Sequence, residues 1–161
     1  MASESETIMR AKLPFFLLGI IVLIISACVI PNNELKIEDF SIYNGEIERA
    51  SYQVEIARNK SSRRQGMMFR KELALNQGML LDYKRSAKMA IWMKNTYLPL
   101  DIIFVNDAGI IVKIHEGAEP LSTKQISSES KVRAVLEINA GQVEIKGISV
   151  GDKVTYPSFD R

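Results

Sequence analysis

The residues best suited to chemistry gather in one stretch, IWMKNTYLPLDIIF, at residues 91–104. A compact polar cluster that begins beside Trp92 separates two apolar segments, and Asp101 stands inside the second segment. Side-chain alternation along 99–105 places apolar residues on both faces, which is typical of a central strand covered on both sides. Asp101 is therefore expected to be at least half buried, and a buried carboxylate needs partners. The candidate partners are three cations and the donors of one turn: Arg64, Arg70, Lys94 and the backbone N–H groups of 95–97.

A second carboxylate stands near the end of another apolar strand, at 132–138. Alternation places Glu137 on the same face of this strand as Arg133 and Val135. The residues expected to face the core lie on the other face, namely Val132, Ala134, Leu136 and Ile138. Two interpretations stay open for the acids. Each is a satisfied structural group, or Asp101 and Glu137 form a ligand-binding or acid/base pair with an arginine between them.

Trp92 closes an expected strand, where it packs as a cap or offers its ring as a platform for a sugar or another ring ligand. Asn95 and Thr96 are good turn formers that also supply polar groups close to this ring in the sequence. The candidate ligand-binding residues are Arg64, Arg70, Trp92, Asn95, Thr96, Asp101 and Glu137.

Composition excludes several kinds of chemistry. Cys28 and His115 are the only residues of their types, so the chain cannot form an internal disulfide, a thiolate zinc site or a two-histidine metal site. It carries no motif for nucleophilic catalysis or for phosphate binding by a glycine-rich loop. We therefore expect no metal and no cofactor. The net charge is only +2 and no basic run has interleaved aromatic residues, so we expect no nucleic-acid partner.

The first 30 residues are typical of a targeting segment rather than of a folded domain. Residues 13–30 carry no charge and follow Arg10 and Lys12, which is the pattern of a secretory signal that starts at Met1 or Met9.

ISAC at 25–28 resembles a bacterial lipobox, in which Cys28 is lipidated and becomes the new N-terminus. The alternative is an uncleaved membrane anchor, because a charge-free segment of this length reaches the lower end of a bilayer span. Both interpretations predict a membrane-anchored, extracytoplasmic β-rich domain at 36–161 after a short tether at 31–35.

Alternating apolar residues and turn signals predict a mainly β fold, a compact β-sandwich or jelly-roll-like barrel with one or two short helices. The Asn-Gly pair in YNGE at 43–46 predicts a hairpin. The expected strands are 36–43, 51–57, 79–83, 88–93, 99–105, 110–115, 131–138 and a last strand within 151–156. The expected helical segments are 61–64, 70–74 and a turn within 140–146, and 116–130 is expected to be the longest loop.

Five blocks occur in order and resemble the family called domain of unknown function 192. They are RQGMMFR at 64–70, GMLLDY at 78–83, the 91–104 stretch, AVLEINAG at 134–141 and GISVGDKV at 147–154. The resemblance covers about residues 50–156 and implies a jelly-roll type of β-sandwich with short helices, in a family whose members are often exported or lipid-anchored. It implies no specific activity. Leu81-Asp82 departs from the more apolar pattern of the family, and His115 lies outside that pattern.

These observations favour a non-catalytic, membrane-tethered domain that binds a small ligand. One alternative is a hydrolase or isomerase that uses Asp101 and Glu137 as acid and base. Another is a structural or assembly factor with a protein interface, for which an exposed apolar patch around Met67, Met68 and Phe69 is expected.

Overall fold

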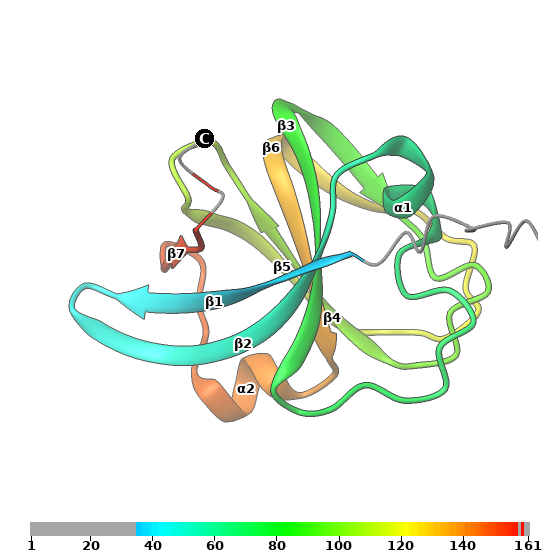
Figure 1. The fold of residues 1–161 in the computed structure, drawn as a ribbon, viewed down its shortest axis with the longest axis horizontal. Coiled ribbons are helices and arrows are strands. Elements are labelled where there is room, and N and C mark those ends of the chain that lie inside the picture. Colours follow the sequence, from blue (N-terminus) through cyan, green and yellow to red (C-terminus); the bar gives the residue numbers. More distant parts are fainter. Residues whose placement is uncertain (1–34, 158, 160–161) are drawn as a thin grey trace, which may run out of the picture. The chain divides into compact units, whose positions relative to one another are not determined.

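The expected strands pair into one sheet in the computed structural model, which describes residues 35–157 and Phe159 (Figure 1). The elements of this part of the chain are β1 Lys36–Asn44, β2 Ile47–Ala57, α1 Lys60–Gln65, β3 Gln77–Ile91, β4 Leu100–Val105, β5 Ile111–Ala118, β6 Ile126–Asn139, α2 Gln142–Lys146 and β7 Lys153–Thr155. The predicted signal or anchor at 1–30, with Cys28, and the tether up to residue 34 lie outside the described residues.

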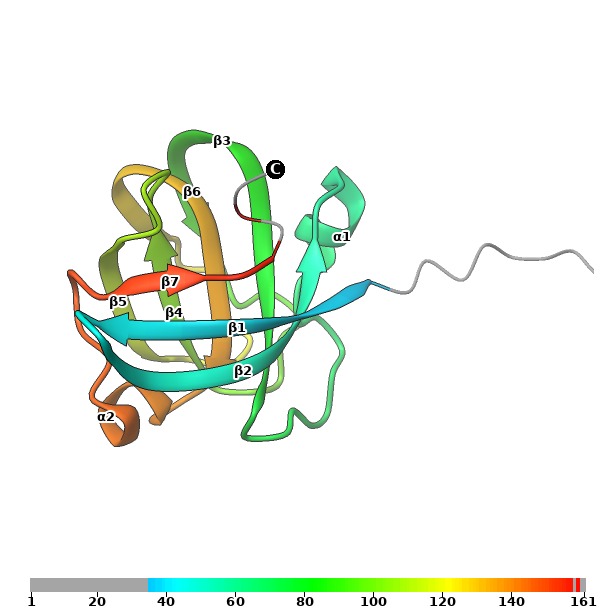
Figure 2. The same ribbon diagram turned by 60° about the vertical axis from the view of Figure 1, so that its left-hand side comes forward.

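The strand order in the sheet is β5-β4-β6-β3-β2-β1-β7. Only β2 and β3 pair in parallel among these neighbours. β1 and β2 run across the direction of β4 and β6, so the sheet curls into a half-barrel (Figures 1 and 2). A bridge between Ile110 and Lys153 links the segment before β5 to β7, so the two ends of the strand order meet. The mainly β, barrel-like fold with two short helices is thereby confirmed, and all of the described residues belong to one compact unit.

The predicted hairpin is confirmed with a small change in its turn. Asn44 pairs with Ile47, so Gly45 and Glu46 are the two turn residues. Gly45 has a φ of +60°, which glycine adopts without the steric cost of a side chain. Asn44 remains in the strand, and its side chain donates a hydrogen bond to Asp152 at 2.7 Å.

One predicted interruption is continuous strand, and one predicted loop is shorter than expected. Residues 79–83 and 88–93 belong mostly to the single long strand β3, because the chain bulges between Asp82 and Ala87 instead of turning away from β6. The predicted loop 116–130 is also wrong at both ends, since β5 continues to Ala118 and β6 already begins at Ile126. Cross-strand pairing with the end of β3 orders the polar start of β6.

The predicted helix at 70–74 does not form. Asn139 instead donates side-chain hydrogen bonds to the carbonyls of Leu73 and Ala74, and Arg70 is held by Glu55 of β2. These tertiary contacts override the helix propensity of the segment.

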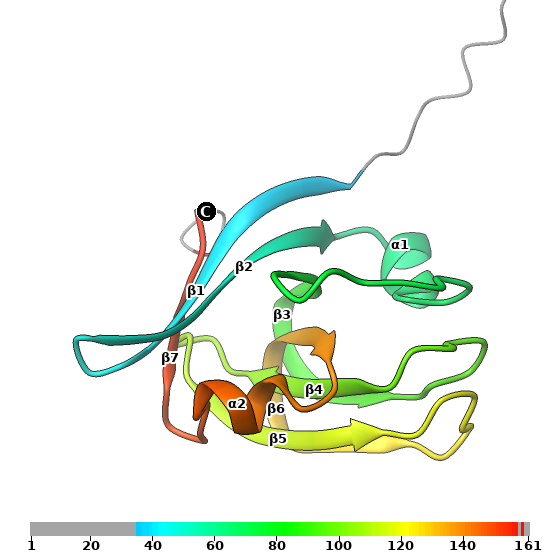
Figure 3. The same cartoon turned by 90° about the horizontal axis from the view of Figure 1, so that it is seen from below.

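The sheet is covered on both faces at β4, as alternation predicts. All of β4 is buried, and Ile103 and Val105 pack in one apolar cluster with residues of β1 and β2. Leu100, Ile102 and Phe104 pack on the other side, in what we call the methionine-rich cluster. Its buried members are Ala57, Met67, Met79, Leu81, Ile91, Met93, Leu100, Ile102, Phe104, Ala118, Val132 and Val135. Figure 3 shows α1 and α2 at opposite ends of the sheet. Two members of the methionine-rich cluster flank α1, Ala57 before it and Met67 after it.

Candidate functional site

Asp101 is fully buried, and both of its carboxylate oxygens are occupied by backbone donors. Oδ1 accepts a hydrogen bond from Gly117 N–H at 2.9 Å, and Oδ2 accepts one from Val143 N–H at 3.0 Å. The predicted partners are therefore wrong: neither the cations Arg64, Arg70 and Lys94 nor the 95–97 turn supplies these bonds. Asp101 joins β5 and the start of α2 to the central strand, which is a structural role.

Glu137 lies on the opposite face of the sheet from Asp101. In the β4–β6 register Asp101 pairs with Ile138, and Ile102 pairs with Glu137. Residues that are paired point to the same face, so Glu137 points with Ile102 into the methionine-rich side. The two carboxylates do not share a cavity and cannot act on one substrate as an acid/base pair.

Glu137 is 5 % exposed, and its Oε2 atom has no hydrogen-bond partner among the described residues. Burial raises the pKa of Glu137 to about 7, while the charge of Arg70 and a hydrogen bond from the Met67 backbone lower it in part. The pKa of Tyr83 is also raised, first by burial and then by the neighbouring charge of Glu137. The carboxyl group is thus held in a dry environment that favours its neutral form.

The end of α1 makes room for this carboxyl group. Asn59 caps the start of the helix by accepting a hydrogen bond from Ser62 N–H at 2.8 Å. Gly66 ends it with a φ of +48°, and a Cβ added there would lie 3.3 Å from Glu137 Oε2. A glycine at this point lets the backbone turn and also approach the carboxylate closely.

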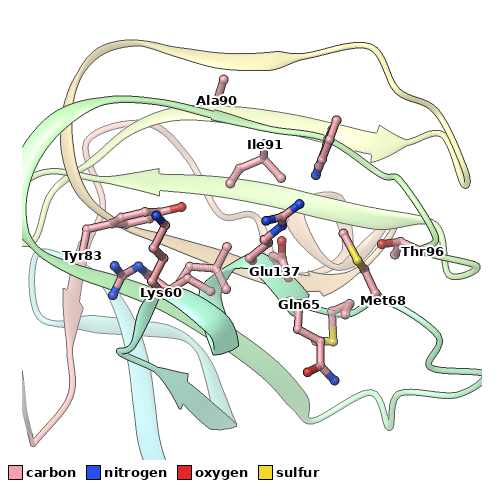
Figure 4. A pocket seen from close by; sticks show the side chains of 14 residues that line it. Lys60, Gln65, Met68, Tyr83, Ala90, Ile91, Thr96 and Glu137 are labelled. Atoms are coloured by element: carbon pink, nitrogen blue, oxygen red, sulfur yellow. The ribbon is translucent and has the colours of Figure 1, made fainter.

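A pocket of about 320 Å³ lies between the α1 region and β3. Figure 4 shows Glu137 in its middle, with Lys60 and Tyr83 toward one end and Met68 and Thr96 toward the other. The lining residues are Lys60, Arg63, Arg64, Gln65, Gly66, Met67, Met68, Leu81, Tyr83, Ala90, Ile91, Trp92, Thr96 and Glu137. Its wall therefore combines a buried acid, exposed cations, aromatic rings and thioethers.

Four of the seven predicted site residues line this pocket: Arg64, Trp92, Thr96 and Glu137. Arg70 lies next to it, in a second pocket, where it forms two hydrogen bonds of 2.6 Å with Glu55. Asn95 is a turn residue with a φ of +58°, and its carbonyl accepts a hydrogen bond from Phe69 N–H.

Sequence reasoning missed Lys60, Arg63 and Tyr83 as members of the pocket. Arg63 donates to the carbonyls of Arg58 and Asp82, and its guanidinium carbon lies 4.8 Å from the centre of the Tyr83 ring. The sequence does carry a signal for these residues, because they lie in two stretches, 56–71 and 83–100, that contain no acidic residue.

The expected apolar patch is only partly exposed. Met67 is buried, Met68 is half-buried, and Phe69 is 60 % exposed. Phe69 meets the ring of Tyr97 edge to face, with the centroids 6.5 Å apart. This pair lies beside the pocket, because the Phe69 N–H donates a hydrogen bond to Asn95, in the same turn as the pocket residue Thr96.

The described residues contain neither a cluster of metal ligands nor a membrane-spanning helix. Within 35–157 and Phe159 there is no group of three or more His, Cys, Asp or Glu side chains that could hold a metal ion. The same part of the chain has no helix with the length and apolarity needed to span a membrane.

Comparisons with known proteins match a family and several solved structures, including the following two. The sequence model of the DUF192 family, described as Uncharacterized ACR, matches residues 43–156. A crystal structure of a proposed transcription regulator from Sinorhizobium meliloti 1021 is 39% identical with a TM-score of 0.74, over 76% of this chain and 95% of that chain. A protein of unknown function from Novosphingobium aromaticivorans DSM 12444 is 33% identical with a TM-score of 0.73, over 78% of this chain and 89% of that chain. No curated protein matches the sequence.

Proposed function

The chain belongs to the DUF192 family, and on that premise we propose that it is a membrane-tethered extracytoplasmic domain that binds a small ligand beside Glu137. The observation that carries this proposal is the contrast between the two buried acids. Asp101 has a backbone donor on each oxygen, whereas Glu137 lines a pocket and has an oxygen without a partner among the described residues. A buried polar group that lacks a partner lowers stability, and a ligand that supplies the partner would remove this cost.

A binding role agrees better with the pocket than a paired acid/base mechanism does. Glu137 is the only carboxylate among the lining residues, and Asp101 points to the other face of the sheet. The raised pKa of Glu137 favours a second candidate, an enzyme in which this residue alone transfers a proton. If a ligand found in the pocket is chemically converted, and Glu137→Gln binds it without converting it, the second candidate replaces the first.

A thermal-shift screen tests the binding role. The fragment 34–161 is screened against sugars, nucleotides, short peptides and small organic acids, alone and as two matched variants. Ala90→Trp fills the pocket from an exposed position of β3, while Ala87→Trp adds the same side chain to an exposed position that does not line it. We expect at least one compound to raise the melting temperature of the parent and of Ala87→Trp, but not of Ala90→Trp. If no compound does so, the binding role loses its support.

The membrane tether is tested on the full chain. The expectation comes from the uncharged segment 13–30, from Arg10 and Lys12 before it, and from Cys28 in the lipobox-like ISAC. Lipidation predicts that Cys28→Ser moves the protein from the membrane fraction to the soluble fraction or blocks its maturation. Retention of Cys28→Ser at its original size in the membrane fraction would indicate an uncleaved anchor instead.

We also expect no binding to nucleic acid, because the net charge is only +2. A gel-shift assay of the same fragment with duplex DNA checks this. A shift that weakens steeply with added salt would contradict it.

A further inference from the structure

Basic residues without nearby acids are concentrated in two stretches of the sequence. Residues 56–71 contain six bases and no acid, namely Arg58, Lys60, Arg63, Arg64, Arg70 and Lys71. Residues 83–100 contain four bases and no acid, namely Lys84, Arg85, Lys88 and Lys94. In a chain with a net charge of only +2, this distribution is uneven.

The fold brings both stretches to the same pocket. Of its fourteen lining residues, seven come from 56–71 and five come from 83–100. The other two are Leu81 and Glu137, so Glu137 is the only acid in the lining. Segments without acids thus surround a single carboxyl group, whose neutral form is favoured by burial.

The cations in this lining are not neutralised by carboxylates of the described residues. Arg63 donates from Nη1 to two backbone carbonyls, which are neutral acceptors and do not cancel its charge. Lys60 and Arg64 are exposed, and their side chains have no hydrogen bond or ion pair with the described part of the chain. Arg70, just outside the pocket, shows the contrast, because Glu55 holds it in a salt bridge of 2.6 Å.

The rest of the lining is apolar and can hold the body of an organic molecule. Ile91 and Leu81 are buried parts of the methionine-rich cluster, and Met68 and Trp92 are partly exposed beside them. The Trp92 side chain is 40 % exposed, so one part of its ring is accessible to a ligand.

We propose that the pocket takes a small organic anion, a carboxylate or phosphate ester on an apolar or aromatic body, with the anionic group beside Lys60 and Arg64 and the body against Ile91 and Trp92. This inference rests on the proposed binding function and names its ligand class. Charge-assisted hydrogen bonds from lysine and arginine hold such a group, and a protonated Glu137 adds an O–H donor instead of a repelling charge.

Four probes of similar size and different charge test the ligand class: phenylacetate, phenyl phosphate, 2-phenylethanol and phenethylammonium. Binding to the fragment 34–161 is followed by amide chemical shifts of the pocket residues, at low and at high salt. We expect the two anions to bind about tenfold tighter than the neutral alcohol, and the cation to bind most weakly. The stronger of the two anions identifies the head group. High salt should weaken the anions and leave the alcohol unchanged.

Matched variants locate the charge that is responsible. Arg64→Gln and Lys60→Gln should each reduce anion affinity about three- to tenfold, whereas Lys71→Gln, an exposed residue of the same stretch outside the lining, should leave it unchanged. Equal binding of all four probes, tighter binding of the cation, equal losses in all three variants or no binding of either anion at millimolar concentration overturns the inference. Pocket binding of the neutral alcohol that Ala90→Trp abolishes would leave the proposed function standing while the anion class fails.

Discussion

Asp101 and Glu137 occupy neighbouring strands only one register step apart, yet their carboxyl groups lie on opposite faces of the sheet. The difference in their surroundings follows from this step. Asp101 meets the backbone donors of Gly117 and Val143. Glu137 meets a dry apolar cluster, the bend at Gly66 and a pocket. Asp101 therefore has a structural role that can be tested by stability, whereas Glu137 has a raised pKa and lines the pocket for which we propose a ligand.

Asp101→Asn should lower the free energy of unfolding by about 2–4 kcal/mol, because one oxygen that accepts a backbone N–H becomes an NH₂ group that faces a donor. Urea denaturation of the fragment 34–161 measures the loss. Asp107→Asn, in an exposed turn, is the matched control and should change stability by less than about 0.5 kcal/mol. Equal, small effects of the two substitutions would contradict the structural role.

Glu137→Gln should change the pH dependence of stability. The folded-state pKa of Glu137 is raised from the ordinary 4.5 to about 7, so between these values the folded state binds more protons than the unfolded state. The stability of the parent therefore falls as pH rises through this window, by about 3 kcal/mol in total from this residue, and the loss is complete above about pH 7.

The measurement is the difference between the two unfolding free energies from pH 4 to pH 8, in which contributions of other titrating groups cancel. The variant should gain stability relative to the parent as pH rises. A difference that stays constant across this range would show that Glu137 does not titrate with a raised pKa.

Gly66→Ala should destabilise the domain more than Gly45→Ala. Both glycines have positive φ, so both substitutions add backbone strain of at least about 1 kcal/mol. The strain is larger at Gly66, because its ψ of −133° also lies outside the left-handed helical region. Only at Gly66 would the new Cβ press against Glu137 Oε2, at 3.3 Å, while at Gly45 it meets nothing within 4 Å. Thermal unfolding of the two variants checks this. If Gly45→Ala costs as much as Gly66→Ala, neither the unusual backbone conformation of Gly66 nor its close approach to Glu137 has an energetic consequence.

The faces of the strands could be predicted from the sequence, but the partners of the buried acids could not. Period-two alternation predicts that Asp101 is buried in a two-sided strand, and the structure confirms it. The donors to Asp101 come from Gly117 and Val143, which lie 16 and 42 residues away in the sequence. Their approach depends on a β5 register shift beside Asp101 and on the docking of α2, neither of which leaves a local pattern.

The candidate site could be predicted only in part, because local patterns mark some of its residues while long-range contacts decide which residues share the pocket. Trp92, Thr96 and Glu137 stand out because polar or aromatic groups interrupt apolar stretches, and they do share a pocket with Arg64. Arg70 lies outside the pocket, where it pairs with Glu55 of β2, a residue 15 positions away in the sequence. A helix prediction at 70–74 fails through the same tertiary contacts.

Anion affinity should fall as pH rises through about 7, because ionisation of Glu137 places a negative charge beside the bound anion. The other groups that face Glu137 are Arg70, whose charge is shared with Glu55, and Tyr83, whose pKa is raised above its ordinary range. Neither of them changes charge between pH 5 and 8, so the effect belongs to Glu137. Titration of the fragment with phenylacetate across this range should give at least about fivefold weaker binding at pH 8 than at pH 5.5, and Glu137→Gln should remove this dependence while it retains the tighter affinity. If Glu137→Gln shows the same dependence as the parent, Glu137 is not the group that controls anion binding.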